Sequence, residues 1–259
     1  MFCGLLAILN VLKVTDFADE TATYKYTLSC WLILAAAVLD LLDGLVARLT
    51  RSESAFGAQL DSLCDLVAFG VAPAILIFTR MIDLENTHLA EGSCVFFAVC
   101  GALRLARFNV QKAGIEKKSF TGLPIPAAAG MVVSAFLYFQ RIDPDWQNGF
   151  IQTAIPFLML LLAFLMVSTI SYPSFKQLKL ERRKQFEVLC GVVLVSAMVI
   201  LYKDIIDVFV FWGFALYIVA GIVGYLYTLI KKPKLPTCNE PHPISEEEYK
   251  TNVGQPREM

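Results

Sequence analysis

Long apolar segments recur along the chain, and they constrain its fold more than any other feature. A helix that crosses a bilayer needs about 20 mostly apolar residues, because the hydrocarbon core is about 30 Å thick and each helical residue rises about 1.5 Å. Candidate segments run at 28–49, 58–80, 93–111, 124–140, 149–170, 188–202 and 208–230. The chain is 57% hydrophobic and only 17% charged, whereas soluble domains are roughly 25% charged. We therefore predict an all-α, polytopic integral membrane bundle.

A shorter apolar block, MFCGLLAILNVLKV, opens the chain. It is short for a span and lacks the basic start and small-residue cleavage site of a signal peptide. We interpret it as the remainder of a first helix whose start lies outside this sequence, which gives roughly eight transmembrane helices in one membrane domain at 1–230. Residues 231–259 are polar, contain prolines and show no hydrophobic period, so we expect a disordered cytoplasmic tail there.

Basic and acidic loops alternate between these segments. The basic clusters are Arg48 with Arg51, Lys117 with Lys118, Arg182 to Lys184, and Lys231 with Lys232. The intervening loops are acidic or balanced. The positive-inside rule then predicts a multi-pass protein of the cell membrane whose basic loops and both termini are cytoplasmic.

Composition excludes several classes of function. The formal net charge is only −1, so no basic field indicates a nucleic-acid partner. The seven cysteines are scattered and form no C-x-x-C pair, which argues against a disulfide framework or a zinc cage. His88 and His242 are the only histidines, and neither is near a candidate catalytic cluster, so a Ser-His-Asp triad is not expected. Any metal ion would need carboxylate ligands.

Acidic and small residues interrupt two of the apolar segments in a regular pattern. Asp40, Asp43, Gly44, Ala47 and Arg48 are spaced i, i+3, i+4, i+7 and i+8, and Gly57, Asp61 and Asp65 are spaced i, i+4 and i+8. Each set falls along one face of a helix. The intervening LTRSESAF can reverse the chain, and Ser52 or Ser54 can cap the second helix. The four carboxylates are therefore expected to face one another near the cytoplasmic boundary.

Four carboxylates near a bilayer require compensation, because a single charge at membrane depth costs about 2.5–3.5 kcal/mol. Oxygen ligands of this kind select hard ions such as Mg²⁺ or Mn²⁺, which commonly complete their coordination with substrate phosphates. The small residues leave room for a ligand, and Arg48 can bind a phosphate through two donors. Alternatively, the acids are solvated helix ends paired with arginines, and the small residues only permit close packing. The complete pattern favours phosphoryl chemistry.

The pattern D-x-x-D-G-x-x-A-R, eight residues, then G-x-x-x-D-x-x-x-D runs without a gap from Asp40 to Asp65. It resembles the signature of the CDP-alcohol phosphotransferases. This resemblance implies a helical, usually homodimeric membrane enzyme, with an interfacial segment before the first helix and two Mg²⁺ or Mn²⁺ ions at the cytoplasmic face. Such enzymes displace CMP from a CDP-linked alcohol by the hydroxyl of a second alcohol.

The same resemblance implies roles for single residues. Asp40, Asp43 and Asp61 would be metal ligands, and Asp65 would take the proton from the attacking hydroxyl and also contact a metal ion. The residues implied around the CDP group are Gly44, Ala47, Arg48 and Gly57.

Two further stretches, GALRLARFNV and FTGLPIPAAAG, concern the acceptor. Arg104 and Arg107 are i and i+3 on one helix face, with Asn109 close by. They are either snorkelling anchors or an anion pocket, and the lysines that follow favour the pocket. Both stretches resemble segments of the phosphatidylserine synthase branch of the family, which implies L-serine as acceptor. Arg104 or Arg107 would then hold its carboxylate, or alternatively a lipid phosphate.

The expected activity is transfer of a phosphatidyl group from CDP-diacylglycerol to L-serine. One alternative keeps the chemistry and uses glycerol 3-phosphate, inositol phosphate or an amino alcohol as acceptor. A second alternative, a divalent-cation transporter, predicts acidic residues spread through the depth of the membrane. The aspartates instead cluster on two consecutive segments at one face.

Overall fold

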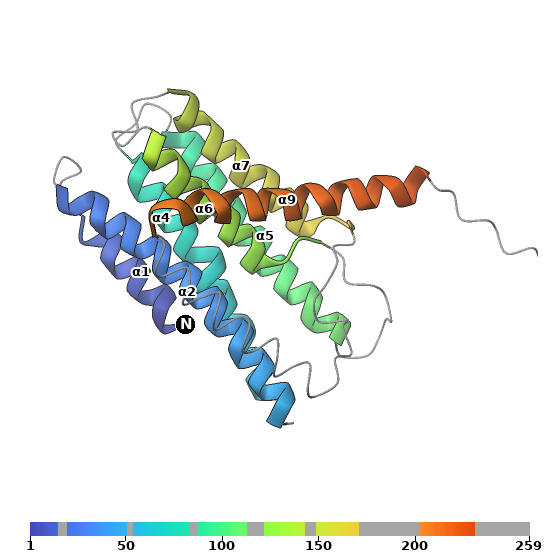
Figure 1. Ribbon diagram of the computed structural model, residues 1–259. Coiled ribbons are helices and arrows are strands. Elements are labelled where there is room, and N and C mark those ends of the chain that lie inside the picture. Colours follow the sequence, from blue (N-terminus) through green and yellow to red (C-terminus); the bar gives the residue numbers. More distant parts are fainter. Residues whose placement is uncertain are drawn as a thin grey trace, which may run out of the picture. The chain divides into compact units, whose positions relative to one another are not determined.

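The computed structural model describes residues 1–14, 20–50, 54–82, 87–112, 122–142, 149–170 and 203–230, and over these ranges it is entirely helical (Figure 1). The helices are α1 (Phe2–Leu12), α2 (Glu20–Thr50), α3 (Ala55–Asp65), the π-helix η1 (Leu66–Val71), α4 (Ala72–Met81), α5 (Thr87–Lys112), α6 (Ile125–Ile142), α7 (Gly149–Val167) and α9 (Lys203–Ile230).

Six of the described helical segments are long and apolar enough to cross a membrane. They are Thr21–Gly44, Phe56–Met81, His88–Val110, Ile125–Ile142, Gly149–Val167 and Asp207–Tyr227, and the shorter apolar helix Phe2–Leu12 accompanies them. The predicted all-α, multi-pass membrane fold is thus confirmed. The predicted span at 188–202 and the predicted tail at 231–259 lie outside the described residues, so the helix count of roughly eight and the domain boundary stay predictions.

One helical rod, formed by α3, η1 and α4 in succession, changes its winding in the middle. The backbone N–H of Ala72 donates to the carbonyl of Val67, five residues earlier, which defines the π-helical turn. Pro73 follows at the start of α4. A proline ring clashes with the carbonyl four residues before it in a regular helix, and the wider turn ahead of Pro73 relieves that clash. The widened turn begins directly after Asp65.

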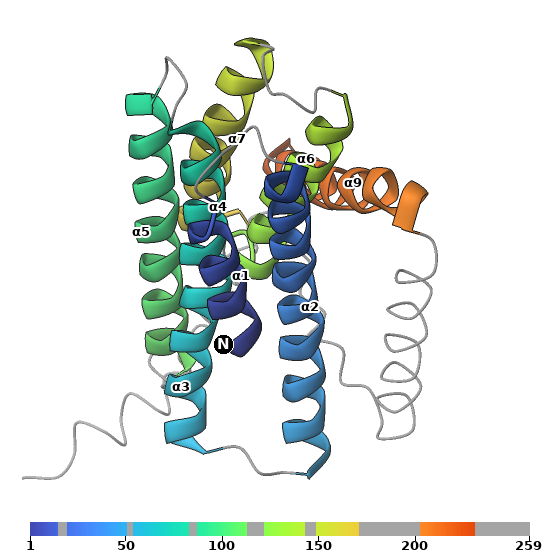
Figure 2. The ribbon, with the colours of Figure 1, turned by 90° about the vertical axis from the view of Figure 1, so that its left-hand side faces the viewer.

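Helix α1 packs between α2 and α4 and against η1 (Figure 2). Its approach to η1 is close, because a Cβ atom added to Gly4 would lie 2.8 Å from the Cα atom of Ala68. On the other side, the hydroxyl of Ser29 in α2 donates to the carbonyl of Ala7 at 3.0 Å. A small residue and a buried hydroxyl thus set the position of α1 beside the π-helical turn.

The entry to α6 is tied to the end of α7 by backbone hydrogen bonds. Gly122 has a φ of +92°, a conformation that glycine adopts without strain, and its N–H donates to the carbonyl of Ile170 at 2.8 Å. The next N–H, from Leu123, donates to the carbonyl of Leu165 at 3.0 Å. Gly122 and Leu123, just ahead of α6, therefore anchor its start to the end of α7.

Helix α9 carries aromatic residues onto α6. The ring of Phe214 occupies the space where Gly130 would place a side chain, and Tyr138 stacks on Phe211 with ring centroids 4.7 Å apart. A guanidinium nitrogen of Arg141 lies 3.4 Å from a carboxylate oxygen of Asp207. The small residues at 127–130 thus receive a bulky side chain from a helix much later in the chain.

Large apolar side chains also cover the outer surface of these helices. Val95, Val99 and Leu103 form an exposed row on α5, spaced i, i+4 and i+8, and Leu161 and Phe164 are exposed on α7. Soluble monomers rarely expose apolar surface of this extent. Hydrocarbon chains of a bilayer are the environment that such surfaces match.

Candidate active site

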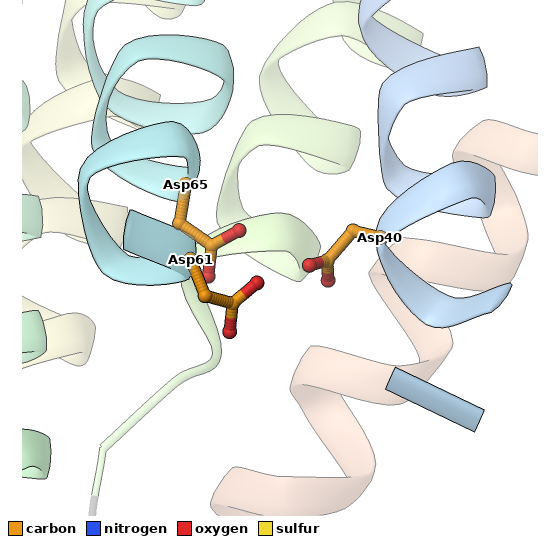
Figure 3. Close-up of side chains that lie close together, drawn as sticks. All are labelled: Asp40, Asp61 and Asp65. Atoms are coloured by element: carbon orange, nitrogen blue, oxygen red, sulfur yellow. The ribbon is translucent and has the colours of Figure 1, made fainter. Parts of the chain in front are cut away.

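Three carboxylates meet between α2 and α3. Asp40, Asp61 and Asp65 each offer one oxygen, and these oxygens all lie within 4.8 Å of one another. Figure 3 shows Asp61 and Asp65 directed from one helix toward Asp40 on the other. Because residue 40 meets residues 61 and 65, α2 and α3 run antiparallel here, as the sequence predicts.

The local sequence explains how α3 presents its two aspartates. Ser54 caps the helix, since its Oγ accepts a hydrogen bond from the N–H of Gly57 at 3.0 Å. This confirms one of the two predicted caps, whereas Ser52 lies outside the described residues. Four residues make slightly more than one helical turn, so Asp61 and Asp65 project on the same side. Asp61 is exposed and Asp65 is half-buried.

Asp43 stands one turn further along α2 than Asp40. Its side chain is exposed, and the trio of converging carboxylates is made of the other three predicted aspartates. Asp43 is therefore not one of the three converging carboxylates. Its assignment as a metal ligand stays a prediction.

The predicted CDP-binding residues have different surroundings in the structure. A Cβ atom on Gly44 would meet no atom within 4 Å, so open space adjoins α2 at this position. A Cβ atom on Gly57 would lie 3.0 Å from Ser54 Oγ, which gives this glycine a role in the helix cap. Ala47 and Arg48 lie on α2, and their side chains are outside the described part of the structure.

The predicted acceptor residues on α5 have three different surroundings. Arg107 donates from a guanidinium nitrogen to the carbonyl of Val167, the last residue of α7, at 3.2 Å. Asn109 Nδ2 donates to the Oγ atom of Ser62 at 3.0 Å. Arg104 has a buried Nε atom with no hydrogen-bond partner among the described residues, and Asp65 lies within electrostatic range of it.

Two residues near the cluster were not identified from the sequence. Ser62 lies between the two aspartates of α3 and bonds to Asn109, and Tyr217 of α9 lies within electrostatic range of Arg104. A serine next to an aspartate gives a weak signal by itself. Neither contact could be predicted, because the hydrophobic periodicity of a helix does not specify how that helix is rotated against its neighbours.

The donor set fits a hard divalent cation. Three carboxylates that approach this closely repel one another, and a cation between them removes the repulsion. Their ligand atoms are all oxygen, the donor that Mg²⁺ and Mn²⁺ prefer. The Asp61 side chain is exposed, so a phosphate-bearing ligand can reach the cluster past this residue.

Comparisons with known proteins agree with this chemistry. The family model described as CDP-alcohol phosphatidyltransferase matches residues 1–170. A CDP-diacylglycerol–serine O-phosphatidyltransferase from Helicobacter pylori is 35% identical over 210 residues, which cover 81% of this chain and 84% of the relative.

Two archaeal proteins are similar over a shorter part. An enzyme of the same printed name from Methanocaldococcus jannaschii is 42% identical over 144 residues, 56% of this chain and 63% of the relative. An archaetidylserine synthase from Methanothermobacter thermautotrophicus is 41% identical over 148 residues, 56% of this chain and 58% of the relative.

Proposed function

The chain belongs to the CDP-alcohol phosphatidyltransferase family, and on this premise we propose that it transfers the phosphatidyl group of CDP-diacylglycerol to the hydroxyl of L-serine. The products are phosphatidylserine and CMP. The observation that carries the proposal is the convergence of Asp40, Asp61 and Asp65 within the segment that the family model matches.

We assign metal binding to this trio, with Asp43 as a further ligand. Bound Mg²⁺ or Mn²⁺, two ions by family resemblance, would neutralise the diphosphate and the CMP that leaves. The carboxylates would hold the metal ions at the end of the hydrophobic segments, where the diphosphate of a lipid substrate meets water. Such a position suits a substrate with two acyl chains and a polar nucleotide.

Asp65 is proposed as the general base. It is half-buried, ends α3 and lies within electrostatic range of Arg104. A carboxylate in this place can accept the proton of the attacking hydroxyl, which is otherwise a poor nucleophile. The oxygen then attacks the phosphorus atom bonded to the diacylglycerol oxygen, and the bond from that phosphorus to the CMP oxygen breaks.

Gly44, Ala47, Arg48 and Gly57 are proposed to surround the CDP group. The open space beside Gly44 supports this placement. Arg48 follows Asp40 by about two helical turns on the same face, so its charge is available to the nucleotide phosphates.

Arg104 is our candidate for the serine carboxylate. Its buried and unpartnered Nε atom offers a donor near Asp65, so one amino acid could present its carboxylate to Arg104 and its hydroxyl to Asp65. Arg107 already donates to the end of α7, which makes it the weaker candidate. A lipid phosphate remains the other ligand that Arg104 would suit.

The names of the three relatives support serine as acceptor. Each name contains serine, whereas the lipid part differs between CDP-diacylglycerol and archaetidyl. Homodimer formation and a cytoplasmic active site in the cell membrane belong to the same proposal, supported by the family resemblance and by the alternation of basic loops.

The first test is CMP release from CDP-diacylglycerol by the purified protein in detergent with Mn²⁺ or Mg²⁺. The acceptors compared are L-serine, glycerol 3-phosphate, inositol phosphate and none, each with and without EDTA. We expect release with serine alone and its loss in EDTA. Release with another acceptor would keep the aspartate chemistry and overturn the serine assignment, and no release with any acceptor would contradict the transferase.

A further inference from the structure

Helix α3 carries two of the three converging aspartates but lacks a packed face of its own. None of its described side chains is buried, and only Ser62, Cys64 and Asp65 are half-buried. The rotation of a helix about its axis is normally fixed by an apolar face packed on the core. The buried η1 and α4 continue the same rod and fix one end of α3, so any further hold on Asp61 and Asp65 must come from side-chain contacts along α3 itself.

Polar contacts with α5 supply this constraint. Asn109 Nδ2 donates to Ser62 Oγ at 3.0 Å and lies 3.5 Å from Oε1 of Gln59. The Ser62 hydroxyl lies 3.1 Å from the carbonyl of Ala58, which can take its proton, and 3.2 Å from Oδ1 of Asn109. One side chain of α5 thus contacts two positions of α3 that are one turn apart.

The end of α5 is itself held in place. Arg107, two residues before Asn109, donates to the carbonyl of Val167 at the end of α7. The same end of α7 receives the backbone N–H of Leu123 through Leu165. A hydrogen bond from Asn109 therefore joins α3 to a region that several helices already fix.

The direction of this bond matters for the aspartates. Successive residues of an α-helix are about 100° apart, so Ser62 faces α5 while Asp61, its neighbour, faces α2. A bond on the α5 side therefore fixes the angle at which both aspartates approach Asp40. We propose that Ser62 and Asn109 are positioning residues of the metal cluster, an inference that rests on the proposed metal-binding role of Asp40, Asp61 and Asp65.

The test measures Mn²⁺ binding directly, without nucleotide or acceptor, by electron paramagnetic resonance of free Mn²⁺ over the purified protein. The variants are Ser62→Ala, Asn109→Ala, the double variant and Ser62→Thr, which keeps the hydroxyl. Ser134→Ala is the matched control, because this serine also donates to a carbonyl within its own helix, at 3.2 Å, but lies on α6.

Each single alanine variant should weaken Mn²⁺ binding about threefold to tenfold, the effect of one net hydrogen bond. The double variant should match Asn109→Ala, because that change already removes the bond to Ser62 together with the longer contact to Gln59. Ser62→Thr and Ser134→Ala should stay within about twofold of the parent, less than one such bond contributes. In metal-free protein, hydrogen exchange of the amides at 58–66 should be faster in both alanine variants.

Three outcomes would overturn the proposal: unchanged Mn²⁺ affinity in both single variants, additive losses in the double variant, or unchanged exchange in α3. A raised KM for serine in Asn109→Ala, with unchanged metal binding, would instead return Asn109 to the acceptor site. A parent protein that binds Mn²⁺ but does not use serine would refute the proposed acceptor only. If the parent binds no Mn²⁺, the proposed metal role fails, and the exchange of α3 in metal-free protein still decides whether Ser62 and Asn109 hold this helix.

Discussion

At the scale of single residues, the acidic cluster consists of chemically identical side chains in different surroundings. Asp40 and Asp65 are half-buried, Asp61 is exposed, and all three can place an oxygen on one ion. Asp65 differs from Asp61 in lying within electrostatic range of Arg104. This difference in surroundings supports the different roles proposed for two carboxylates that lie one turn apart.

Asp65→Asn should abolish turnover while sparing much of the Mn²⁺ affinity, because the amide keeps an oxygen ligand but cannot take a proton. Asp61→Ala should impair both. CMP release and Mn²⁺ titration on the same preparations separate the two effects. Full activity in Asp65→Asn would refute its role as the base.

Arg104 and Arg107 should respond differently to the same substitution. Arg104→Gln should raise the KM for serine about 10- to 100-fold, as expected for the loss of a hydrogen bond to a charged group. Arg107→Gln should leave that KM within about twofold and lower thermal stability slightly, because a cation at a helix C-terminus contributes about 0.3–1 kcal/mol. Steady-state kinetics at varied serine, with a melting curve for each variant, checks both expectations. Equal effects on KM would contradict the separate roles.

At the scale of helices and turns, the π-helical turn sets the angular relation between the aspartates and the core. In a regular α-helix Phe69, four residues after Asp65, would stand over it. Because η1 adds a residue to the turn, Gly70 takes this place, and the Phe69 ring is buried in the core. Gly70, rather than Phe69, therefore follows Asp65 on the same face of the helical rod.

The turn that enters α6 gives a stability prediction at this scale. Gly122→Ala should destabilise the protein strongly, because φ is +92° and the new Cβ atom would lie 2.3 Å from the carbonyl oxygen of Met166. Strain at such a backbone position alone costs about 1–3 kcal/mol. Thermal unfolding in detergent measures the loss, and Gly149→Ala is the control, since a Cβ atom there meets nothing within 4 Å. Similar melting temperatures for both variants would contradict this reading of the turn.

At the scale of the whole molecule, the orientation of the protein in the membrane can be tested at one pair of positions. Ser54 starts α3 and His88 lies near the start of α5, and both are exposed at opposite ends of successive spans. In a cysteine-free background, Ser54→Cys should react with an impermeant maleimide only from the cytoplasmic side, and His88→Cys only from the other side. Labelling of intact cells and of inverted vesicles checks this. Permeabilised membranes, in which both positions should react, are the control, and the reverse pattern would overturn the proposed orientation.

The sequence predicted the helical membrane fold and the meeting of α2 and α3, because apolar length and the i, i+4 spacing of aspartates are local properties. It did not predict that Arg107 would bond to the end of α7 or that Asn109 would bond to Ser62. Those contacts depend on how helices rotate against one another, which small residues such as Gly4 and Gly130 settle through contacts with distant parts of the chain. The sequence showed that a stretch is basic, but it did not show which partner each basic side chain contacts.

The π-helical turn after Asp65 also has a consequence for length variation. A π-helical turn is equivalent to an α-helix into which one residue has been inserted. Removal of a single residue from 66–71 would then convert η1 to a regular helix and bring the ring of Pro73 back against the carbonyl four residues before it. A deletion between Asp61 and Asp65 would instead change the angle between these two side chains on the helix. Loss of one residue from η1 would therefore keep the carboxylate cluster only where Pro73 is replaced as well.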